Sequence, residues 1–547
     1  MLHRRLAGFG IGTGVVVAGV AGFGSSAAFA VDPDDLESRV TVAGITTHLQ
    51  ALQDIADANG GNRAIGTPGY EASGQYIESV LTAAGYTPVR QPFQATTQTI
   101  DDFSITLLGT TTGPEGDRIP MEGTTETAVG GIVDAEMVVP ATATGCTTEE
   151  WGGVVATAKV AVVSRGACSF AEKSLAAAGA GAAAVLIYNN EPGPLNGTLG
   201  EQVPEYIPSV GLTQEEGAAL VAALPGNPTV SLTLQETTTT VDTFNIIAET
   251  PTGRDDNTVM LGAHLDSVPE GPGINDNGSG SAAILETAVQ LAASGDLNNQ
   301  VRFAWWGAEE VGLVGSTYYV DDLAANDPDE LDEIATYLNF DMVASPNYVI
   351  SVYDADQSTY EAPVEVPEGS IATEKAFTDY FDAIGQPWID TAFDARSDYD
   401  AFIANDVAAS GLFTGADDEK TVDQAALFGG TGGPGITPDP NYHSAADGIA
   451  NVNADALGIM AGAIASVTAS LANDTTAINQ YPPVVVPVDP APVPEPVAEP
   501  AATGSQLAAT GADGALSALP VGVLLLGAGT VLAVLRMRTV RTGARRG

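Results

Sequence analysis

The sequence predicts an α/β fold in which a mixed, mostly parallel central sheet is flanked by helices. The observations behind this class are three apolar runs, TVMLGAH (258–264), VRFAWWGAEE (301–310) and ATYLNFD (335–341). Each has the pattern of a buried strand and ends at once in His, Asp or Glu. Open α/β sheets place their sites at the carboxyl ends of the strands, so the sheet would gather these residues despite their distance in sequence.

Five residues at such positions can bind a metal through nitrogen or carboxylate oxygen: His264, Asp276, Glu310, Asp341 and His443. Two zinc ions about 3.5 to 4 Å apart need one bridging carboxylate, a histidine on each ion and one further carboxylate per ion. We assign His264 and Asp341 to one ion and Glu310 and His443 to the other. Asp276 would bridge both, which predicts a two-zinc hydrolase.

Glu309 is adjacent to a predicted ligand but is not needed as one. Zinc lowers the pKa of its water from about 9 towards about 7, so a neighbouring carboxylate can take the proton. Glu309 fits the role of this general base. The pair Glu309-Glu310 could instead be an exposed acidic turn, but it directly follows FAWWGA, which would bury one face.

Each candidate ligand also has a plainer interpretation, because a single His or Asp at a strand end is usually a solvated loop residue or a helix cap. Their joint occurrence favours the metal site. The chain has only four histidines, and two of them, His264 and His443, belong to the proposed set.

Five motifs surround these residues: HLDSV from His264, GPGINDNGSGSAA from Gly271, RFAWWGAEEVGLVGS from Arg302, YLNFDM from Tyr337 and NYHSAAD from Asn441. Together they are similar to the motifs of the M28 family of zinc aminopeptidases, especially the secreted Streptomyces-type enzymes. The resemblance covers about residues 45–90 and 241–470.

This resemblance implies the zinc-peptidase (phosphorylase/hydrolase-like) fold, with the five residues above as zinc ligands and Glu309 as the base. It also implies that the Tyr442 hydroxyl stabilises the tetrahedral oxyanion and that Arg396 and Phe413 lie in the substrate site. Asp266 would orient the His264 imidazole through a hydrogen bond. Peptides would be the substrates, with large apolar N-terminal residues preferred.

The resemblance further implies a cis peptide bond at Asp276-Asn277. The sequence also departs from the Streptomyces type, whose relatives carry a disulfide around the final His motif. Here those places read Asn441 and Ala446, so this loop is not crosslinked. We do not infer a calcium site in this chain from the resemblance.

Residues 125–238 resemble the protease-associated (PA) domain inserted in many exported peptidases, a small β-rich fold flanked by helices. This stretch holds the only cysteines, Cys146 and Cys168. Two cysteines in an exported chain usually pair, and related inserts carry a disulfide at similar places, which favours a bridge over two free thiols. The insert would limit access to the site or bind substrate, or serve only as a spacer.

The two ends of the chain predict export and a surface anchor. A basic start, an apolar stretch and AFA before Val31 form an export signal, with Sec and Tat routes both open. Near the other end, LAATG (507–511) precedes an apolar run (515–535) and five arginines. This order resembles a sortase sorting signal cleaved between Thr510 and Gly511, which would attach the protein to cell wall peptidoglycan; a plain membrane anchor is the alternative.

Six segments are therefore expected. They are the signal peptide (1–30), the N-terminal peptidase part (31–124), the PA insert (125–238), the catalytic part (239–475), a Pro-rich linker (481–506) and the sorting signal with its hydrophobic segment and basic tail (507–547).

The chain is strongly acidic, with 69 Asp and Glu against 19 Lys and Arg and a net charge of −50. This charge argues against nucleic acid as a partner. We interpret the sequence as an exported two-zinc aminopeptidase. The alternatives are another activity on the same scaffold, a carboxypeptidase or a glutaminyl cyclase, and a surface binding protein that acts through its insert.

Overall fold

The structure, a computed structural model, describes residues 31–113, 116–200 and 202–481. The expected export signal, the Pro-rich linker beyond Tyr481 and the LAATG motif with its Thr510-Gly511 bond lie outside the described residues. The same is true of the apolar run 515–535 and the arginines that follow it.

A mixed, mostly parallel sheet forms the centre of the main domain, which confirms the expected fold class. Its strands follow the order β8-β10-β9-β11-β14-β12-β13. Strands β10, β9, β11 and β14 are parallel neighbours, whereas β8 pairs antiparallel with β10, and β12 with β14. The bounds are β8 (Thr229–Glu249), β9 (Arg254–His264), β10 (Asn299–Trp306), β11 (Ile334–Phe340), β12 (Ser351–Tyr353), β13 (Ile389–Thr391) and β14 (Ala409–Phe413).

Two adjacent tryptophans show that both faces of this sheet are buried. Successive side chains of a strand point to opposite faces. Trp305 packs into the hydrophobic core on one face of the sheet and Trp306 into the core on the other, and both are fully buried. A strand covered on both sides has no polar face, which explains why β9, β10 and β11 are apolar along most of their length.

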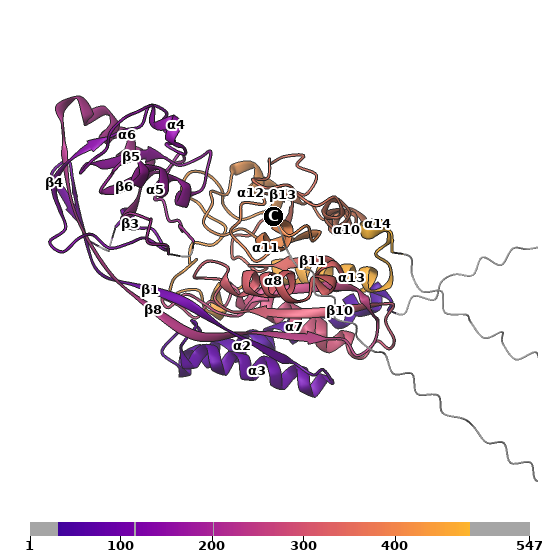
Figure 1. The fold of residues 1–547 in the computed structure, drawn as a ribbon. Coiled ribbons are helices and arrows are strands. Elements are labelled where there is room, and N and C mark those ends of the chain that lie inside the picture. Colours follow the sequence, from indigo (N-terminus) through magenta and orange to yellow (C-terminus); the bar gives the residue numbers. More distant parts are fainter. Residues whose placement is uncertain (1–30, 114–115, 201, 482–547) are drawn as a thin grey trace, which may run out of the picture. The chain divides into compact units, whose positions relative to one another are not determined.

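Helices from distant parts of the sequence cover the two faces. Figure 1 shows α2 and α7 below β10 and α8 above it. The helices that contribute to the first core are α1 (Pro33–Arg39), α2 (Val42–Ala58), α3 (Pro68–Ala84), α7 (Gly278–Leu291), α10 (Gly369–Ile384) and α13 (Ala454–Asn473); those of the second are α8 (Val314–Asn326), α9 (Pro328–Asp332) and α11 (Asp400–Ala404).

Within the described part of the chain, α13 is the one helix long and apolar enough to cross a membrane. Its apolar stretch is 72% buried. Leu457, Met460 and Ile464 of this helix belong to the first core. Helix α13 is therefore a core helix of the main domain.

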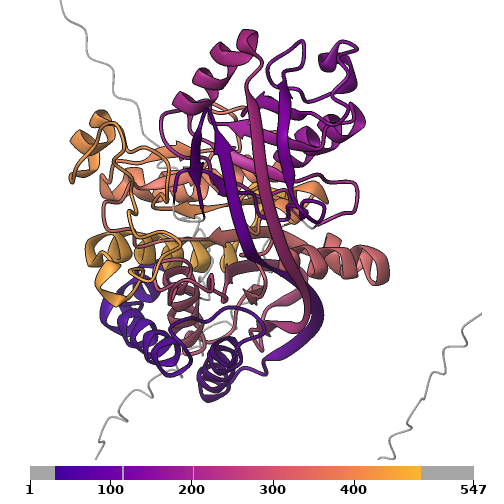
Figure 2. The same ribbon diagram turned by 90° about the vertical axis from the view of Figure 1, so that its left-hand side faces the viewer.

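The expected insert is joined to the main sheet by two long antiparallel strands, β1 (Val89–Leu107) and β8. They pair from Val89 opposite Ile247 to Leu107 opposite Val230, and Figure 2 shows them side by side. Strand β8 continues through Thr238 without a break, so the two domains share this strand.

The insert has its own small sheet and two cores. Strands β4, β5, β6 and β7 are parallel neighbours, and β3 closes the far edge antiparallel to β7. This arrangement of short strands and helices agrees with the expected PA fold. The elements are β3 (Ile119–Pro120), β4 (Ile132–Val138), α4 (Thr148–Trp151), β5 (Val160–Ser164), α5 (Phe170–Gly179), β6 (Ala184–Tyr188), β7 (Ser209–Leu212) and α6 (Gln214–Ala223).

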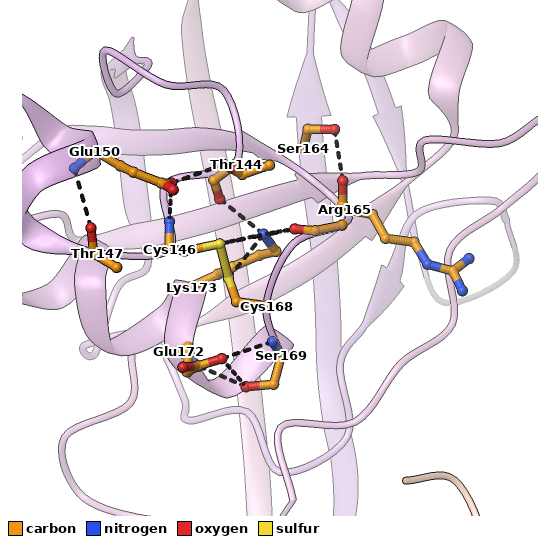
Figure 3. The surroundings of a disulfide bond; sticks show 11 residues. Thr144, Cys146, Thr147, Glu150, Ser164, Arg165, Cys168, Ser169, Glu172 and Lys173 are labelled. Atoms are coloured by element: carbon orange, nitrogen blue, oxygen red, sulfur yellow. Dashed lines mark hydrogen bonds between the residues drawn. A yellow bond between two sulfur atoms is a disulfide. The ribbon is translucent and has the colours of Figure 1, made fainter. Parts of the chain in front are cut away.

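A disulfide between Cys146 and Cys168 links two loops of the insert (Figure 3). The Lys173 ammonium lies beside it, 3.5 Å from the first sulfur and 3.3 Å from the second. It also donates to the carbonyl oxygens of Thr144 and Gly166. Burial lowers the pKa of Lys173 to about 8, and these carbonyls satisfy its donors.

Candidate metal centre and substrate pocket

The five candidate ligands converge at the carboxyl ends of the main strands. His264 is the last residue of β9, Asp341 directly follows β11, and Glu310 follows β10 after a short turn. Asp276 directly precedes the N-cap residue of α7, and His443 lies in the loop that leads to α13. Strand order rather than sequence distance brings these side chains together, because neighbouring parallel strands end at the same edge.

Asp276 lies between the two histidines with one carboxylate oxygen toward each. Oδ1 is 3.2 Å from Nε2 of His264, and Oδ2 is 3.2 Å from Nε2 of His443. Oδ1 of Asp341 is 3.3 Å from Nε2 of His264, and Oε2 of Glu310 is 3.0 Å from Nε2 of His443. Each histidine Nε2 therefore lies close to one oxygen of Asp276 and to one further carboxylate oxygen.

The chemistry of these sets fits a divalent metal. Oε1 of Glu310, Oδ1 of Asp341 and Nε2 of His443 are buried and make no hydrogen bond. Among the described residues, no lysine or arginine forms an ion pair with these carboxylates, with Asp276 or with Glu309. Buried charges without a partner are costly, and imidazole with carboxylate is a donor set that zinc accepts.

Glu309 lies beside the ligand set, with Oε2 3.8 Å from Nε2 of His264. Burial raises the pKa of Glu309 well above its usual value; His264 opposes this shift, and the carboxylates of Asp341 and Asp398 reinforce it. Burial and the neighbouring Asp276 also raise the pKa of Glu310, to about 7. Burial thus makes the Glu309 carboxylate a stronger proton acceptor, as a general base requires.

Asp266 is fully buried and contacts two segments of the site. Its main-chain oxygen is 3.1 Å from Nδ1 of His264, whereas the nearer carboxylate oxygen is 3.7 Å away. The carboxylate instead accepts hydrogen bonds from the main-chain N–H groups of Glu309 and Glu310. Asp266 thus orients the imidazole through its backbone and fixes the turn after β10 through its side chain.

The peptide bond between Asp276 and Asn277 is cis, as the resemblance implied. The Asn277 side chain connects this bond to the end of β11. Its Nδ2 donates to the Phe340 carbonyl, and its Oδ1 accepts from the N–H of Met342. Asn277 therefore ties the segment of Asp276 to that of Asp341.

Two further polar residues at the site were missed by sequence reasoning. Ser397 donates a 2.7 Å hydrogen bond to Oδ2 of Asp341 and accepts one from Asn339. Asp398 is buried next to it, and burial raises the pKa of its carboxyl group to about 7. Both lie in the irregular segment ARSD, where no strand pattern or ligand spacing marks them in the sequence.

A pocket of about 170 Å³ opens beside the ligands. Asp276, Glu309, Glu310 and Asp341 are among the residues that line it. Arg396 and Phe413, which were expected in the substrate site, line the same pocket. Tyr442, which was expected to stabilise the oxyanion, lines it as well, together with Met342, Tyr353 and Tyr360.

Tyr442 and Arg396 lie in different surroundings within this pocket. The Tyr442 ring stacks on His443 with the ring centroids 3.7 Å apart, and burial raises the pKa of its hydroxyl well above the usual value. The hydroxyl is therefore a proton-bearing hydrogen-bond donor at neutral pH. Arg396 is held at the pocket wall by an ion pair with Asp417, at 3.1 Å.

A buried cluster of histidines and carboxylates that lines a pocket at the carboxyl edge of an α/β sheet is typical of metallohydrolases. Comparison with known proteins narrows this class. The Peptidase family M28 profile matches residues 245–468, and the PA domain profile matches residues 133–220.

The chain is similar to two bacterial proteins along most of its length. It is 43% identical to the probable lipoprotein aminopeptidase LpqL of Mycobacterium tuberculosis, over 82% of this chain and 88% of the relative. It is 42% identical to an aminopeptidase of Pseudomonas aeruginosa, over 82% of this chain and 84% of that protein. The solved aminopeptidase from Aneurinibacillus sp. strain AM-1 has 25% identity and a TM-score of 0.63, over 84% of this chain and 99% of that one.

The chain belongs to peptidase family M28 and carries an inserted PA domain. It is a hydrolase that acts on peptide bonds, and its relatives are named aminopeptidases.

We predict that Asp276→Ala loses bound zinc, because each of its two carboxylate oxygens lies 3.2 Å from one of the two histidines. Elemental analysis of the purified variant should find less than one zinc per chain, against two in the wild type. Asp379→Ala, which changes an exposed carboxylate on α10, is the control and should keep both ions. Two zinc ions in Asp276→Ala would contradict the bridging role.

Proposed function

We propose that this chain is an exported aminopeptidase that binds two zinc ions and removes N-terminal residues, above all large apolar ones, from peptides. The position of Asp276, with one oxygen 3.2 Å from each of two histidines, carries the proposal. Membership of family M28 and the aminopeptidase relatives support the exopeptidase activity.

His264 and Asp341 would hold one ion, Glu310 and His443 the other, and Asp276 both. When bound, the zinc ions would polarise the scissile carbonyl and activate water for attack. The residues of the chain would do the rest: the Glu309 carboxylate would take the proton of the attacking water and deliver it to the leaving amine.

Tyr442 would act on the carbonyl oxygen of the substrate. As that oxygen gains negative charge, a hydroxyl fixed in advance stabilises it without reorganisation. The stacking of Tyr442 on His443 keeps the ring next to a proposed ligand, and its raised pKa keeps the proton on the hydroxyl.

The pocket supplies the two features that an aminopeptidase needs. Four carboxylates line it, so Glu309 and the neighbouring carboxylates would recognise a free, positively charged α-amine. Met342, Tyr353 and Phe413 also line the pocket and would take an apolar side chain.

The location of the enzyme is proposed from the ends of the sequence. The signal at 1–30 would direct export, and LAATG with the apolar run and arginines would serve sortase-mediated attachment to peptidoglycan. A membrane anchor is the alternative. A relative described as a probable lipoprotein aminopeptidase is consistent with a protein at the cell surface.

A panel of aminoacyl-nitroanilides with N-acetylated controls tests the activity. Substrates with a free α-amine should be cleaved, Leu and Phe derivatives fastest, because Met342, Tyr353 and Phe413 line the pocket. The acetylated controls should resist, since they lack the charge that the carboxylates of the pocket would recognise. Equal cleavage of both series would exclude an aminopeptidase, and cleavage only at a free carboxyl end would identify a carboxypeptidase.

We predict that Glu309→Gln keeps both zinc ions and loses most of its rate. The amide has the shape of the carboxylate but cannot accept the proton, and loss of a general base costs roughly 100- to 10,000-fold. The kcat on Leu-nitroanilide and the zinc content check this. Glu270→Gln, at an exposed position on the loop before Asp276, is the control and should keep the rate. A fast Glu309→Gln enzyme would exclude Glu309 as the base.

The anchor gives a separate prediction for the mature protein in its own cells. If sortase cleaves LAATG, the protein should end at Thr510 and become soluble only after digestion of the cell wall. Mass spectrometry of its C-terminal peptide would show this end. A protein extracted from membranes by detergent with its arginine tail intact would leave the membrane anchor as the explanation.

A further inference from the structure

Arg63 has an unusual environment for an arginine. It lies in the loop between α2 and α3, and its side chain is fully buried. A buried arginine normally pairs with a carboxylate, but Arg63 forms no ion pair in the described part of the chain. Its guanidinium donates to three main-chain carbonyls: Nε to Pro272 at 2.9 Å, Nη1 to Leu265 and Nη2 to Gly273.

All three carbonyls belong to one segment, residues 265–275, which we name the strap. The strap joins His264 to Asp276 and contains no helix or strand. Arg63 contacts it near both ends, because Leu265 directly follows one proposed ligand and Gly273 lies three residues before the other. The fork of the guanidinium therefore fixes the two ends of the strap relative to each other.

Two more contacts come from the same loop. The N–H of Arg63 donates to Oγ of Ser267 at 2.9 Å, and Nδ2 of Asn62 donates to the Pro269 carbonyl at 3.1 Å. The loop between α2 and α3 is thus hydrogen-bonded to the strap at several points along its length.

Asp447 binds the strap through its amide groups. Its carboxylate accepts hydrogen bonds from the N–H groups of Asn275, at 2.9 Å, and Asp276, at 3.0 Å. Its main-chain oxygen accepts from the N–H of Ile274 at 3.0 Å. A guanidinium on the carbonyls and a carboxyl group on the amides make complementary contacts with one irregular segment.

Burial also acts on the ionisation of Arg63. Burial lowers the pKa of Arg63 to about 10, and the carboxylates of Asp266 and Asp447 oppose this shift. Arg63 therefore remains charged at neutral pH.

We propose that Arg63 is a positioning residue that, with Asp447, fixes the strap so that His264 and Asp276 are in the metal-binding arrangement before zinc arrives. This inference rests on the proposed two-zinc site. Hydrogen-bonding partners that orient ligands typically change metal affinity 10- to 100-fold when removed. The positive charge of Arg63 acts in the opposite sense, because it repels a divalent cation. Geometry and charge can therefore be separated by mutation.

Arg63→Lys keeps the charge and removes the fork that reaches three carbonyls. Zinc affinity, measured by competition with a chromophoric chelator, should fall about 10- to 100-fold. Raising free zinc should restore kcat while KM stays near that of the wild type, an effect that a general loss of stability would not produce. Arg63→Met removes both charge and fork and should also weaken binding; tighter binding there would show that repulsion outweighs positioning and would overturn the proposal.

Arg302→Lys is the matched control. Arg302 is also a buried arginine of the main domain, but it pairs with Glu249 and Glu330 and does not contact the strap. The Arg302→Lys substitution should lower the melting temperature of the protein without changing its zinc affinity. An unchanged zinc affinity in Arg63→Lys, or an equal loss in Arg302→Lys, would overturn the proposal.

If Arg63→Lys does not fold, Asp447→Asn decides the question. In this variant the NH2 group of the asparagine side chain would face an N–H group of the strap, and two donors cannot form a hydrogen bond. Zinc affinity should therefore fall as it does in Arg63→Lys. Wild-type zinc affinity in Asp447→Asn would overturn the proposal that Arg63 and Asp447 fix the strap. A wild-type protein that binds fewer than two zinc ions would instead contradict the proposed function itself.

Discussion

The repulsion between buried carboxylates is the constraint on which the site depends. Asp276, Glu309, Glu310 and Asp341 face one small volume, and two like charges about 4 Å apart repel by roughly 4 kcal/mol at an effective dielectric constant near 20. Two imidazoles alone do not offset this charge. The surrounding structure fixes Asp341 through the hydrogen bond from Ser397, and it leaves Oε1 of Glu310 and Oδ1 of Asp341 without partners where a cation would bind.

The central sheet and the ligand cluster could be predicted because they share one local signal. Each of three strands is a continuous apolar run, and a residue able to bind metal follows within a few positions. The parallel order then determines which edge collects them. His443 lacks a strand of its own, and only the motif NYHSAAD and the scarcity of histidine marked it.

The residues that support the cluster could not be found in this way. Ser397, Asp398 and Asp447 lie in irregular segments, where a polar residue has no periodicity to follow. Their roles depend on three-dimensional contacts with main-chain groups. Asp266 was marked by its spacing from His264, but the hydrogen bonds that its carboxylate accepts from the turn after β10 had no signal in the sequence. The expected domain boundary at residue 238 likewise falls inside the continuous strand β8, because pairing with β1 extends beyond the insert.

The alternation of Trp305 and Trp306 has a consequence for how this family can change in length. A strand buried on both faces fits only one register, since a shift by one residue exchanges the environments of all its side chains. In β10 such a shift would also move Glu309 and Glu310 away from His264 and His443. Among homologous sequences, insertions and deletions should therefore be confined to the loops at the amino ends of the strands. The spacing from Asn299 to Glu310 should stay constant.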